Sequence, residues 1–496
     1  MDLIYGLLNC LTLNNLFYCF IGCMLGTLVG VLPGLGPAST IAILLPITTY
    51  LDPTGSIIML SGLYYGAMYG GSTTSILVNI PGEAASVVTC MDGFQMTKQG
   101  RSGQALWVAA IGSFIAGTFG AILCSLLGPG IAKYALKFGP PEYVGLLLFS
   151  MTMLITLSAS LMKGLLAGLA GMVLATVGMD PLTGAPRLHF GVVGMMRGLE
   201  LVPVVVGLFG IGEILLAAEQ GVQNIYRGKL GKMTPRGHDL KQGLLASIRG
   251  TMVGYFPGLI PGMLPALTAF MAYDIEKRVS KYPEKFGTGV IEGVAAPEAA
   301  NNASAMAGFI PLMTLGIPTS ASLAIILAAL VMYGLEPGPA LFLQNKQFVW
   351  TVIGSMYVGN LMLLVLNLPL VGLWARISLI PYKVLGPIIL AVCFVGAYSP
   401  RNTMFDVWVA LIFGIVGFVM KKKGWPLAPL ILGFLLGDLF EVSLRQSLSM
   451  SGGSLSIFWS RPVAAVLIVC TVIFAVFTIK VLRRVPKELL VEEEKL

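Results

Sequence analysis

The sequence predicts an all-α polytopic membrane protein made of two inverted-topology repeats, and three observations lead to this fold class. First, 56% of the 496 residues are hydrophobic and only 11% are Asp, Glu, Lys or Arg, whereas a soluble domain carries about 25% charge. Second, the two halves of the chain share a motif that contains Pro and Gly. Third, equivalent loops of the two halves differ in basic content, and the sign of the difference alternates.

The composition limits the class of protein and the number of membrane segments. A mean hydropathy of +0.86 means that lipid is the solvent for most of the chain. At about 20 apolar residues per span, the chain has room for roughly 10 to 14 membrane segments. A soluble enzyme, a nucleic-acid-binding protein and a receptor with a single anchor are excluded. The 61 Gly and 29 Pro residues predict helices that break where the freed backbone faces protein or water.

The internal repeat is visible as a shared motif. Residues 26–35 read GTLVGVLPGL and residues 250–259 read GTMVGYFPGL, with seven of ten positions identical. Further on, Asn79-Ile80-Pro81 corresponds to Gly316-Ile317-Pro318. The shared order of these Pro-Gly breaks indicates two halves joined by a polar linker.

Loop charges predict that the halves are inverted. The linker between them is basic and therefore cytoplasmic by the positive-inside rule. After the first break, half one has the loop YLDPTG, which contains no cation, whereas half two has DIEKRVSKYPEK with four cations. After the second break the bias reverses, with Lys98 and Arg101 in half one against Lys346 alone in half two. Opposite orientations in the membrane produce this alternation.

The domain boundaries follow from the repeat and the charges. We expect a first repeat over residues 1–225, a basic cytoplasmic linker over 226–245 and a second repeat over 246–457. Residues 458–496 are expected to form a C-terminal transmembrane helix and a cytoplasmic tail. The segments near 16–50 and 246–273 are either full crossings or re-entrant hairpins.

Two segments in corresponding places are too polar and too rich in small residues to be plain spans. They run from Tyr64 to Ser86 and from Glu292 to Ser322. Transporters with inverted repeats build their binding sites from such discontinuous segments. Free N–H groups at helix N-termini attract an anion, and unwound carbonyls with hydroxyl and amide oxygens suit sodium. The competing interpretation is that the small residues only let helices approach closely.

Intramembrane carboxylates are functional candidates by default. Glu298 lies beside an Asn pair in the second segment and is a candidate for ion or proton coupling, with a structural hydrogen bond as the alternative. Glu83 lies at the tip of the first break, and Asp92 is assigned to the inner loop. Glu200 and Glu213 are expected to be helix-packing groups paired with polar neighbours.

An intramembrane enzyme is the competing class of function, and the sequence argues against it. The chain has two histidines, His189 and His238, and neither belongs to an HExxH zinc motif. No GxxxxGK[ST] motif is present, so ATP hydrolysis is not expected. The seven cysteines lie mostly inside apolar runs without a CxxC pair, which indicates core packing.

A set of long motifs, in order along nearly the whole chain, carries a resemblance to a known family. The motifs are LPGLGPAST, YYGAMYGGSTTSILVNIPG, FGPPEY, GMDPLTG, GVAAPEAANNA, LGIP, PGPALF, VGAYS, FDVW and PLAPLILGFLLG. Together they resemble the large membrane subunit, or permease, of the tripartite tricarboxylate transporter family. The resemblance implies secondary uptake of a di- or tricarboxylate at the inner membrane, usually coupled to sodium, with no other cofactor. It also implies a small four-span membrane subunit and a periplasmic solute-binding protein as partners.

Carried over by position, the resemblance gives candidate site residues. The expected substrate-binding residues are Gly34, Gly36, Gly70, Gly71, Ser72, Thr73, Thr74, Asn79, Pro81, Gly82, Pro297, Asn301, Asn302, Gly316, Pro318, Thr319 and Ser320. The expected ion-coupling residues, which are also the candidate sodium ligands, are Ser75, Glu298, Asn301 and Thr314. The site loops would be 70–75 with 79–82, and 295–302 with 316–320. At Glu83 and Thr319 the chain departs from the family pattern, where Thr and Gly are typical, and both changes would alter a carboxylate pocket.

Several alternatives stay open from the sequence. The runner-up function is an anion or water channel, followed by a proton-coupled carboxylate transporter that uses Glu298 and by an assembly scaffold without its own site. We expect an elevator-like motion in which the two broken segments move against the spans at 104–128 and 349–371, with rocking about a fixed site as the competing motion.

Overall fold

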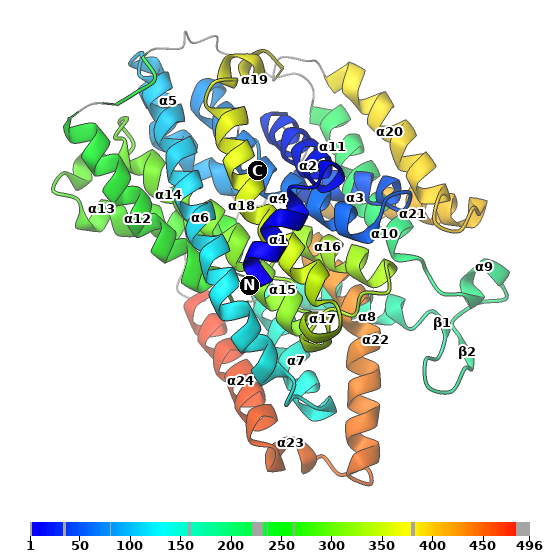
Figure 1. The fold of residues 1–496 in the computed structure, drawn as a ribbon. Helices are drawn as coiled ribbons and strands as arrows, with labels where there is room; N and C mark the ends of the chain where they lie inside the picture. The colour runs from blue at the N-terminus through cyan, green and yellow to red at the C-terminus, as the bar shows by residue number, and fades with distance from the viewer. Residues whose placement is uncertain are drawn as a thin grey trace. The chain divides into compact units, whose positions relative to one another are not determined.

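The computed structural model describes residues 2–32, 36–79, 81–156, 160–220, 232–235, 237–260, 263–377 and 382–482. It divides the chain into two compact units, and each unit takes segments from both halves of the sequence. Figure 1 shows the helices and strands, coloured by residue number. Unit 1 comprises residues 1–132 and 217–389, and unit 2 comprises 133–216 and 390–496. Gly34, residues 226–231 and 236 of the expected linker, and the tail from 483 onward lie outside the described residues.

Unit 1 contains both segments with candidate site residues. Its elements are α1 (Asp2–Cys10), α2 (Leu13–Val31), α3 (Pro37–Thr48), α4 (Pro53–Val78), the 3₁₀ helix η1 (Ala84–Ser86), α5 (Val87–Lys98), α6 (Ser102–Ala135), α12 (His238–Gly258), α13 (Pro265–Val279), the 3₁₀ helix η3 (Pro283–Lys285), α14 (Glu292–Ala307), α15 (Phe309–Leu315), α16 (Ala321–Met332), α17 (Pro339–Gln344), α18 (Lys346–Asn367) and α19 (Val371–Ile377). Helix α6 continues past the boundary of the unit.

Unit 2 is also helical, with one short hairpin. Its elements are α7 (Pro140–Thr156), α8 (Leu161–Ala175), β1 (Gly178–Met179), β2 (Pro186–Arg187), α9 (Val193–Met196), α10 (Leu201–Val205), the π-helix η2 (Val206–Ile211), α11 (Gly212–Gln220), α20 (Tyr382–Tyr398), α21 (Met404–Lys422), α22 (Leu427–Met450), α23 (Ile457–Ser460) and α24 (Pro462–Leu482). The boundary between the units falls inside α11 and α20, whose residues 217–220 and 382–389 belong to unit 1. Strands β1 and β2 pair antiparallel, and no sequence pattern predicts them. Helix α24 lies where the sequence predicts a C-terminal span.

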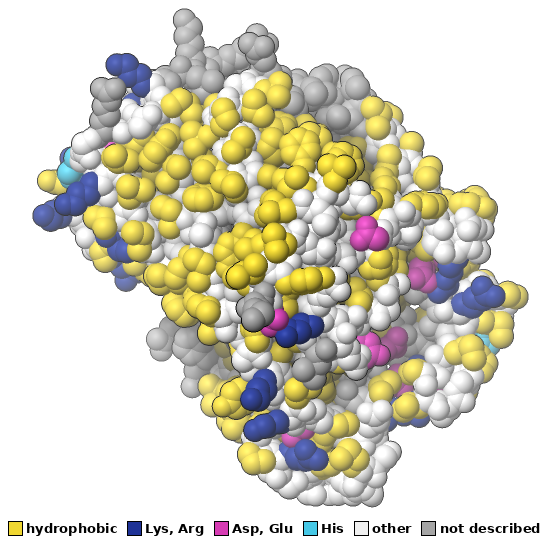
Figure 2. Space-filling model, viewed as in Figure 1, with side chains coloured by type: hydrophobic (Ala, Val, Ile, Leu, Met, Phe, Trp, Pro, Cys, Tyr) yellow, Lys and Arg dark blue, Asp and Glu magenta, His cyan; other side chains and the backbone are white. Residues whose placement is uncertain are grey.

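The helices are those of a multi-pass membrane protein. Five helices in the described part of the chain, α2, α6, α18, α21 and α22, are long and apolar enough to cross a membrane. Six shorter apolar helical stretches of 10–17 residues accompany them. Figure 2 shows hydrophobic side chains spread over the visible face that carries α6 and α18. Mostly helical structure is therefore confirmed, and the number of crossings stays a prediction.

Rows of glycine bring two helix pairs of unit 1 into backbone contact. A Cβ added at Gly26 or Gly30 of α2 would lie 2.4 Å from the Leu63 carbonyl oxygen or 2.3 Å from that of Ala67, both on α4. The two glycines that align with them in the sequence, Gly250 and Gly254 of α12, meet α14 in the same way. Their added Cβ atoms would lie 2.2 Å from the carbonyl oxygens of Ala296 and Ala300, respectively. Both pairs can pack this closely only because glycine has no side chain.

Unit 2 uses the same device in two further pairs. A Cβ at Gly171 of α8 would lie 2.0 Å from the Leu430 carbonyl oxygen of α22. A Cβ at Gly207 of η2 would lie 2.5 Å from the Ala410 carbonyl oxygen of α21. Small residues thus hold the helices of both units at short interaxial distance, as membrane helices require in the absence of a hydrophobic driving force.

Unit 1 interlocks the two halves of the sequence. Helix α5, from half one, packs on α13 and α14, while α16, from half two, packs on α3 and α4. The Asp92 carboxylate of α5 is fully buried and accepts hydrogen bonds from the Tyr273 hydroxyl and from the backbone N–H groups of residues 287, 289 and 290. Asp92 is therefore a structural anchor inside the fold rather than part of an inner loop.

The division into units does not separate the expected scaffold spans from the broken segments, so the division into mobile and scaffold parts stays a prediction. The spans at 104–128 and 349–371 correspond to α6 and α18, and both lie in unit 1 together with the broken segments. The physical reason is polar bonding across the three helices. The Asn360 amide of α18 donates to the Phe114 carbonyl oxygen of α6 at 2.9 Å, and Tyr69 of α4 donates to the Asn360 carbonyl oxygen at 2.6 Å.

Candidate functional site

The first candidate segment is less broken than the sequence predicts. Residues 70–75 lie inside α4, which runs without interruption from Pro53 to Val78, and residues 295–302 lie inside α14. The expectation that these two stretches are site loops is therefore wrong. The glycines and alanines there serve close packing, for which helical backbone is sufficient. The expected loops at 79–82 and 316–320 do end their helices.

In half one, a glutamate side chain caps the helix that follows the break. Asn79 ends α4 in the left-handed conformation, with φ 58° and ψ 31°. Glu83 then caps η1, because its carboxylate accepts the Ala85 N–H at 2.9 Å while the Ser86 hydroxyl returns to the Glu83 backbone. The Glu83 carboxyl group thus occupies the N-terminal end of this helix, where backbone N–H groups lack partners within the helix.

The break in half two has the same backbone and a neutral cap. Gly316 ends α15 with φ 71° and ψ 26°. Ser320 caps α16 by accepting the Leu323 N–H at 3.3 Å, and its hydroxyl lies 3.3 Å from that of Tyr64 on α4. The N-terminal end of α16 therefore carries no charge of its own.

Glu298 is the centre of a buried polar cluster. The side chain is 1% exposed, and its two carboxylate oxygens accept hydrogen bonds from the Ser72 hydroxyl of α4 and the Thr89 hydroxyl of α5. Glu298 itself lies on α14, one residue after Pro297. Helices from both halves of the sequence therefore converge on one carboxylate.

The neighbouring asparagines extend this cluster in two directions. The Asn301 amide donates to the Glu83 carboxylate at 2.9 Å, so it connects α14 with the first break. The carbonyl oxygen of the same side chain is buried and has no hydrogen-bond partner within the described residues. The Asn302 amide donates to the Ser113 hydroxyl of α6 at 2.7 Å. Glu298, Asn301 and Asn302 thus belong to one polar cluster, and their role in a binding site stays a prediction.

The electrostatics of the cluster are unbalanced. Among the described residues, no Lys, Arg or His forms an ion pair with Glu83 or Glu298, although the buried Glu142 and Glu276 both have arginine partners. Burying Glu298, and partly burying Glu83, without a cation is costly, because an uncompensated charge loses its hydration. A bound cation or a bound proton relieves this cost. The described residues contain no group of three or more His, Cys, Asp or Glu that could hold a metal ion.

The candidate glycines divide into packing residues and open positions. A Cβ at Gly70 would lie 2.3 Å from the Thr27 carbonyl oxygen, and one at Gly82 would lie 1.9 Å from the Gly30 carbonyl oxygen. A Cβ at Gly71 would meet the Glu83 side chain at 2.8 Å. Gly36, in contrast, precedes α3 with nothing within 4 Å of an added Cβ. For Gly70 and Gly82 close packing explains the residue, whereas Gly36 stays a candidate.

The remaining candidate hydroxyls are mostly satisfied within their own helices. Thr74 and Ser75 both donate to the Gly71 carbonyl oxygen, at 3.2 and 2.9 Å, and Thr314 donates to that of Ile310 at 2.7 Å. Thr319 is buried, and a Cβ at Gly308 would lie 2.4 Å from its hydroxyl oxygen. Pro81 and Pro318 each follow the left-handed residue of a break by two positions.

The carboxylates assigned to helix packing have the expected partners. In unit 2, Glu200 pairs with Arg401 and Glu213 pairs with Lys421. Both pairs join segments that are about 200 residues apart, so they tie helices together as the sequence predicts for these positions.

The sequence did not predict several of the polar residues in and around this cluster. Thr89, Ser113, Asn360 and Asn367 lie outside the candidate list, and their only sequence signal is a polar residue within an apolar helix. A small cavity of unit 1 is lined by Tyr69, Ser72, Thr73, Leu106, Ala109, Ala110, Ser113 and Asn367. Its volume of about 10 Å³ is close to the smallest space that holds one water molecule.

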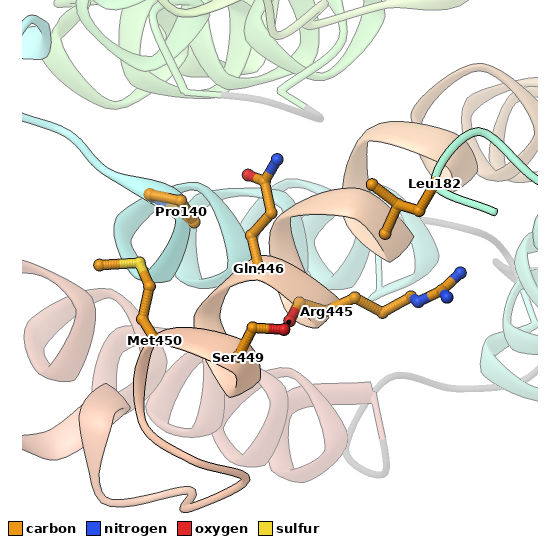
Figure 3. Close-up of a pocket in the computed structure, with 6 residues that line it drawn as sticks. All are labelled: Pro140, Leu182, Arg445, Gln446, Ser449 and Met450. Carbon is orange, nitrogen blue, oxygen red and sulfur yellow. Dashed lines mark hydrogen bonds between the residues drawn. The ribbon is translucent and has the colours of Figure 1, made fainter.

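Unit 2 has a wider surface groove of about 460 Å³, which Figure 3 shows beside α22. It is lined by Pro140, Leu182, Arg445, Gln446, Ser449 and Met450. Arg445 reaches out of the groove to the Asp180 carboxylate at 2.8 Å and the Glu441 carboxylate at 3.1 Å. The bond to Arg445 lowers the pKa of Asp180 and ties the turn between β1 and β2 to α22. The groove therefore has a neutralised cation rather than an available one.

The sequence is similar to a known family and to two proteins of one organism. Residues 16–432 match the family described as "Tripartite tricarboxylate transporter TctA family". An "Uncharacterized 52.8 kDa protein in TAR-I ttuC' 3'region" of Agrobacterium vitis is 44% identical over 479 residues, which is 94% of each chain. An "Uncharacterized protein in TAR-II ttuC' 3'region" of the same organism is 43% identical over 219 residues, which is 44% of this chain and 89% of that one. No solved structure matches.

Proposed function

Because the chain belongs to the tripartite tricarboxylate transporter TctA family, we propose that it takes up a small organic anion, a di- or tricarboxylate, by secondary active transport. The observation that carries the proposal is the pair of carboxylates formed by the buried Glu298 and the partly buried Glu83, which meet helices of both halves without a cationic partner in the described residues. A transporter that moves an anion with a cation needs a site that is incomplete without that cation.

Glu298 is proposed as the coupling residue. Two hydroxyl groups, those of Ser72 and Thr89, are placed to donate to its carboxylate, which is the arrangement that stabilises an ionised group. An ionised Glu298 requires a neighbouring cation, so sodium coupling is the first choice. Proton coupling is the second candidate, since a protonated Glu298 also removes the buried charge.

The substrate carboxylate is proposed to bind at the second break. The N-terminal end of α16 has a neutral cap at Ser320, and the backbone N–H groups there favour an anion. The corresponding end in half one already holds the Glu83 carboxylate. A second anion is disfavoured next to Glu83, which supports a binding site centred on Gly316, Pro318, Thr319 and Ser320.

The repeat and the motion belong to the same proposal. Equivalent left-handed caps at Asn79 and Gly316, and equivalent glycine contacts in the pairs α2–α4 and α12–α14, support an inverted-topology repeat. Such a repeat offers two nearly equivalent packings, inward and outward. The elevator motion predicts that cysteines at Leu77 and Leu106, which pack in one apolar cluster, crosslink only in some substrate or ion states. Crosslinking of equal yield in every state favours rocking instead.

The first experiment separates a transporter from a channel. Purified protein in proteoliposomes is loaded with one carboxylate, and entry of the labelled compound is measured with and without that internal pool. Carrier-mediated exchange is accelerated by the internal substrate, whereas a channel shows non-saturating flux without such stimulation. The second outcome contradicts the proposed function.

The second experiment identifies the coupling ion. A sodium gradient and a pH gradient are imposed separately, and uptake is compared for the wild type and Glu298→Gln. Sodium coupling predicts that only the sodium gradient drives uptake, and Glu298→Gln loses that response because the neutral amide needs no cation. Glu336→Gln, at an exposed position, is the matched control. Uptake by Glu298→Gln that still follows the sodium gradient removes Glu298 from the coupling role.

The partners follow from the family and are part of the proposal. We propose a small four-span membrane subunit, a periplasmic solute-binding protein that delivers the carboxylate, and an inner-membrane location with the C-terminus in the cytoplasm. At micromolar substrate, uptake should need the binding protein. Full uptake by this chain alone contradicts that dependence.

A further inference from the structure

We propose that the small cavity between α4, α6 and α18 binds one dehydrated sodium ion, held by oxygen atoms of Thr73, Ser113 and Asn367. This inference deepens the proposed sodium coupling and rests on it. The site differs from the ion-coupling residues expected from the sequence, because its ligands come from three helices and include α6 and α18.

Asn367 supplies the observation that points to a ligand. Its side-chain amide donates to the Leu363 carbonyl oxygen at 2.9 Å and to the Thr27 hydroxyl at 3.3 Å. Because a backbone carbonyl only accepts, this bond fixes which end of the Asn367 amide is the NH₂ group. The side-chain carbonyl oxygen is buried and has no hydrogen-bond partner among the described residues, and Asn367 is one of the residues that line the cavity. A buried acceptor of this kind calls for a cation or a donor.

Two hydroxyl groups at the cavity wall have already given their protons away. The Ser72 hydroxyl donates to the Glu298 carboxylate, and the Tyr69 hydroxyl donates to the Asn360 carbonyl oxygen at 2.6 Å. The Ser113 hydroxyl oxygen accepts from the Asn302 amide, and its own O–H can rotate away from an ion. The wall therefore offers more lone pairs than free protons, which suits a cation, because a water molecule must accept as well as donate.

Size and charge select the class of ion. A volume of about 10 Å³ accommodates one water-sized particle and excludes a carboxylate. Hard divalent cations prefer carboxylate ligands. No carboxylate lines this cavity directly. Glu298 is one hydroxyl away, through Ser72, and supplies the compensating negative charge. Neutral oxygens with one nearby carboxylate match a small monovalent cation, which is sodium.

The test measures ion binding directly and does not depend on transport. The full-length protein in detergent is heated in sodium, potassium or choline chloride at constant ionic strength, and the Tm is recorded. We expect the Tm to rise with sodium concentration and to change little with the other two cations. Asn367→Leu and Thr73→Val should weaken the apparent sodium affinity by at least about tenfold. Thr251→Val, at a buried threonine of α12 away from the cavity, should keep the wild-type response.

The outcomes separate this site from the proposed function. Thr73→Val is nearly isosteric, so it reports on the ion even if Asn367→Leu fails to fold. A sodium response that is equal in wild type, Thr73→Val and Asn367→Leu places the ion elsewhere and overturns the inference. A wild-type Tm without any sodium dependence means that the cavity holds water only, which also overturns it. Substrate exchange in proteoliposomes would then still test transport independently.

Discussion

The two helix breaks of unit 1 have nearly the same backbone and different chemistry. Residues 83 and 320 both cap a helix, with φ and ψ of −151° and 165° at Glu83 and of −146° and 165° at Ser320. Four residues earlier, Asn79 and Gly316 both adopt the left-handed conformation. Glu83 brings a carboxylate to its break, whereas Ser320 brings a hydroxyl.

This difference shows how a duplicated frame gives an asymmetric site. The backbone of each break exposes N–H groups at a helix N-terminus, which by itself favours an anion. In half one the chain supplies that anion itself, as Glu83. In half two the equivalent place has none, so an external carboxylate has one favourable position rather than two.

The largest effect is expected from exchanging the residues that precede the caps. Gly82→Thr should prevent folding, because its Cβ would lie 1.9 Å from the Gly30 carbonyl oxygen and 2.7 Å from the Gly71 Cα, where neither backbone can yield. Thr319→Gly, the reverse exchange in half two, should fold and lose only packing contacts. Size-exclusion chromatography of fluorescent fusions in mild detergent measures both. Monodisperse Gly82→Thr protein would show that the two breaks are interchangeable.

The next effect concerns charge at the first break. Glu83→Gln keeps an acceptor for the Ala85 N–H and offers an NH₂ group to the unpartnered Asn301 carbonyl oxygen, so the fold should be retained. Removal of one negative charge should shift preference toward carboxylates with an additional charge, by about tenfold or 1.4 kcal/mol. Competition for uptake between di- and tricarboxylates measures the shift. An unchanged order of preference separates Glu83 from substrate selection.

A smaller effect is expected from the left-handed residue of half two. Gly316→Ala should lower the free energy of unfolding by about 1–2 kcal/mol, since an L residue is strained at φ 71°. Its Cβ would also lie 3.1 Å from the Pro337 carbonyl oxygen. Thermal unfolding in detergent detects the loss. Ala in place of Gly334, which has φ 68° and open space around an added Cβ, separates strain from contact.

The smallest effect has the opposite sign. Asn79→Gly should raise stability by a few tenths of a kcal/mol up to about 1 kcal/mol, because glycine adopts φ 58° without steric cost. The gain is limited by the greater conformational freedom of glycine in the unfolded chain. The Tm of Asn79→Gly is compared with that of the wild type. A fall in Tm would mean that the Asn79 side chain contributes contacts that its counterpart Gly316 lacks.

Sequence reasoning predicted a mostly helical membrane protein, the family and the matched breaks, whereas the inverted repeat stays a prediction. The order of Asn79-Ile80-Pro81 and Gly316-Ile317-Pro318 predicted equivalent positions, and the structure gives both first residues the same left-handed conformation. Such positions can be predicted from sequence because only a few residue types adopt the left-handed conformation easily. In addition, the residue before a proline favours an extended conformation. Composition likewise predicts that lipid surrounds most of the chain, and this prediction needs no knowledge of contacts within the fold.

The parts that sequence reasoning missed depend on distance in space. A run of small residues such as 70–75 looks the same whether the helix unwinds or packs closely, and in α4 it packs closely. Thr89, Ser113 and Asn367 are single polar residues in apolar helices, and only folding brings them to Glu298 or to the cavity. The sequence also did not predict the boundary between the units, because each unit takes segments from both halves of the chain.

The Asp92 anchor has a consequence for biosynthesis. Its carboxylate receives N–H groups from residues 287, 289 and 290, which the ribosome adds nearly two hundred residues after Asp92 itself. Until then α5 has no partner for a charge that ends fully buried. We therefore expect the first half to wait in the membrane as an unfinished intermediate, vulnerable to quality-control proteases. A nascent chain arrested before residue 287 should be degraded faster than one arrested after residue 330.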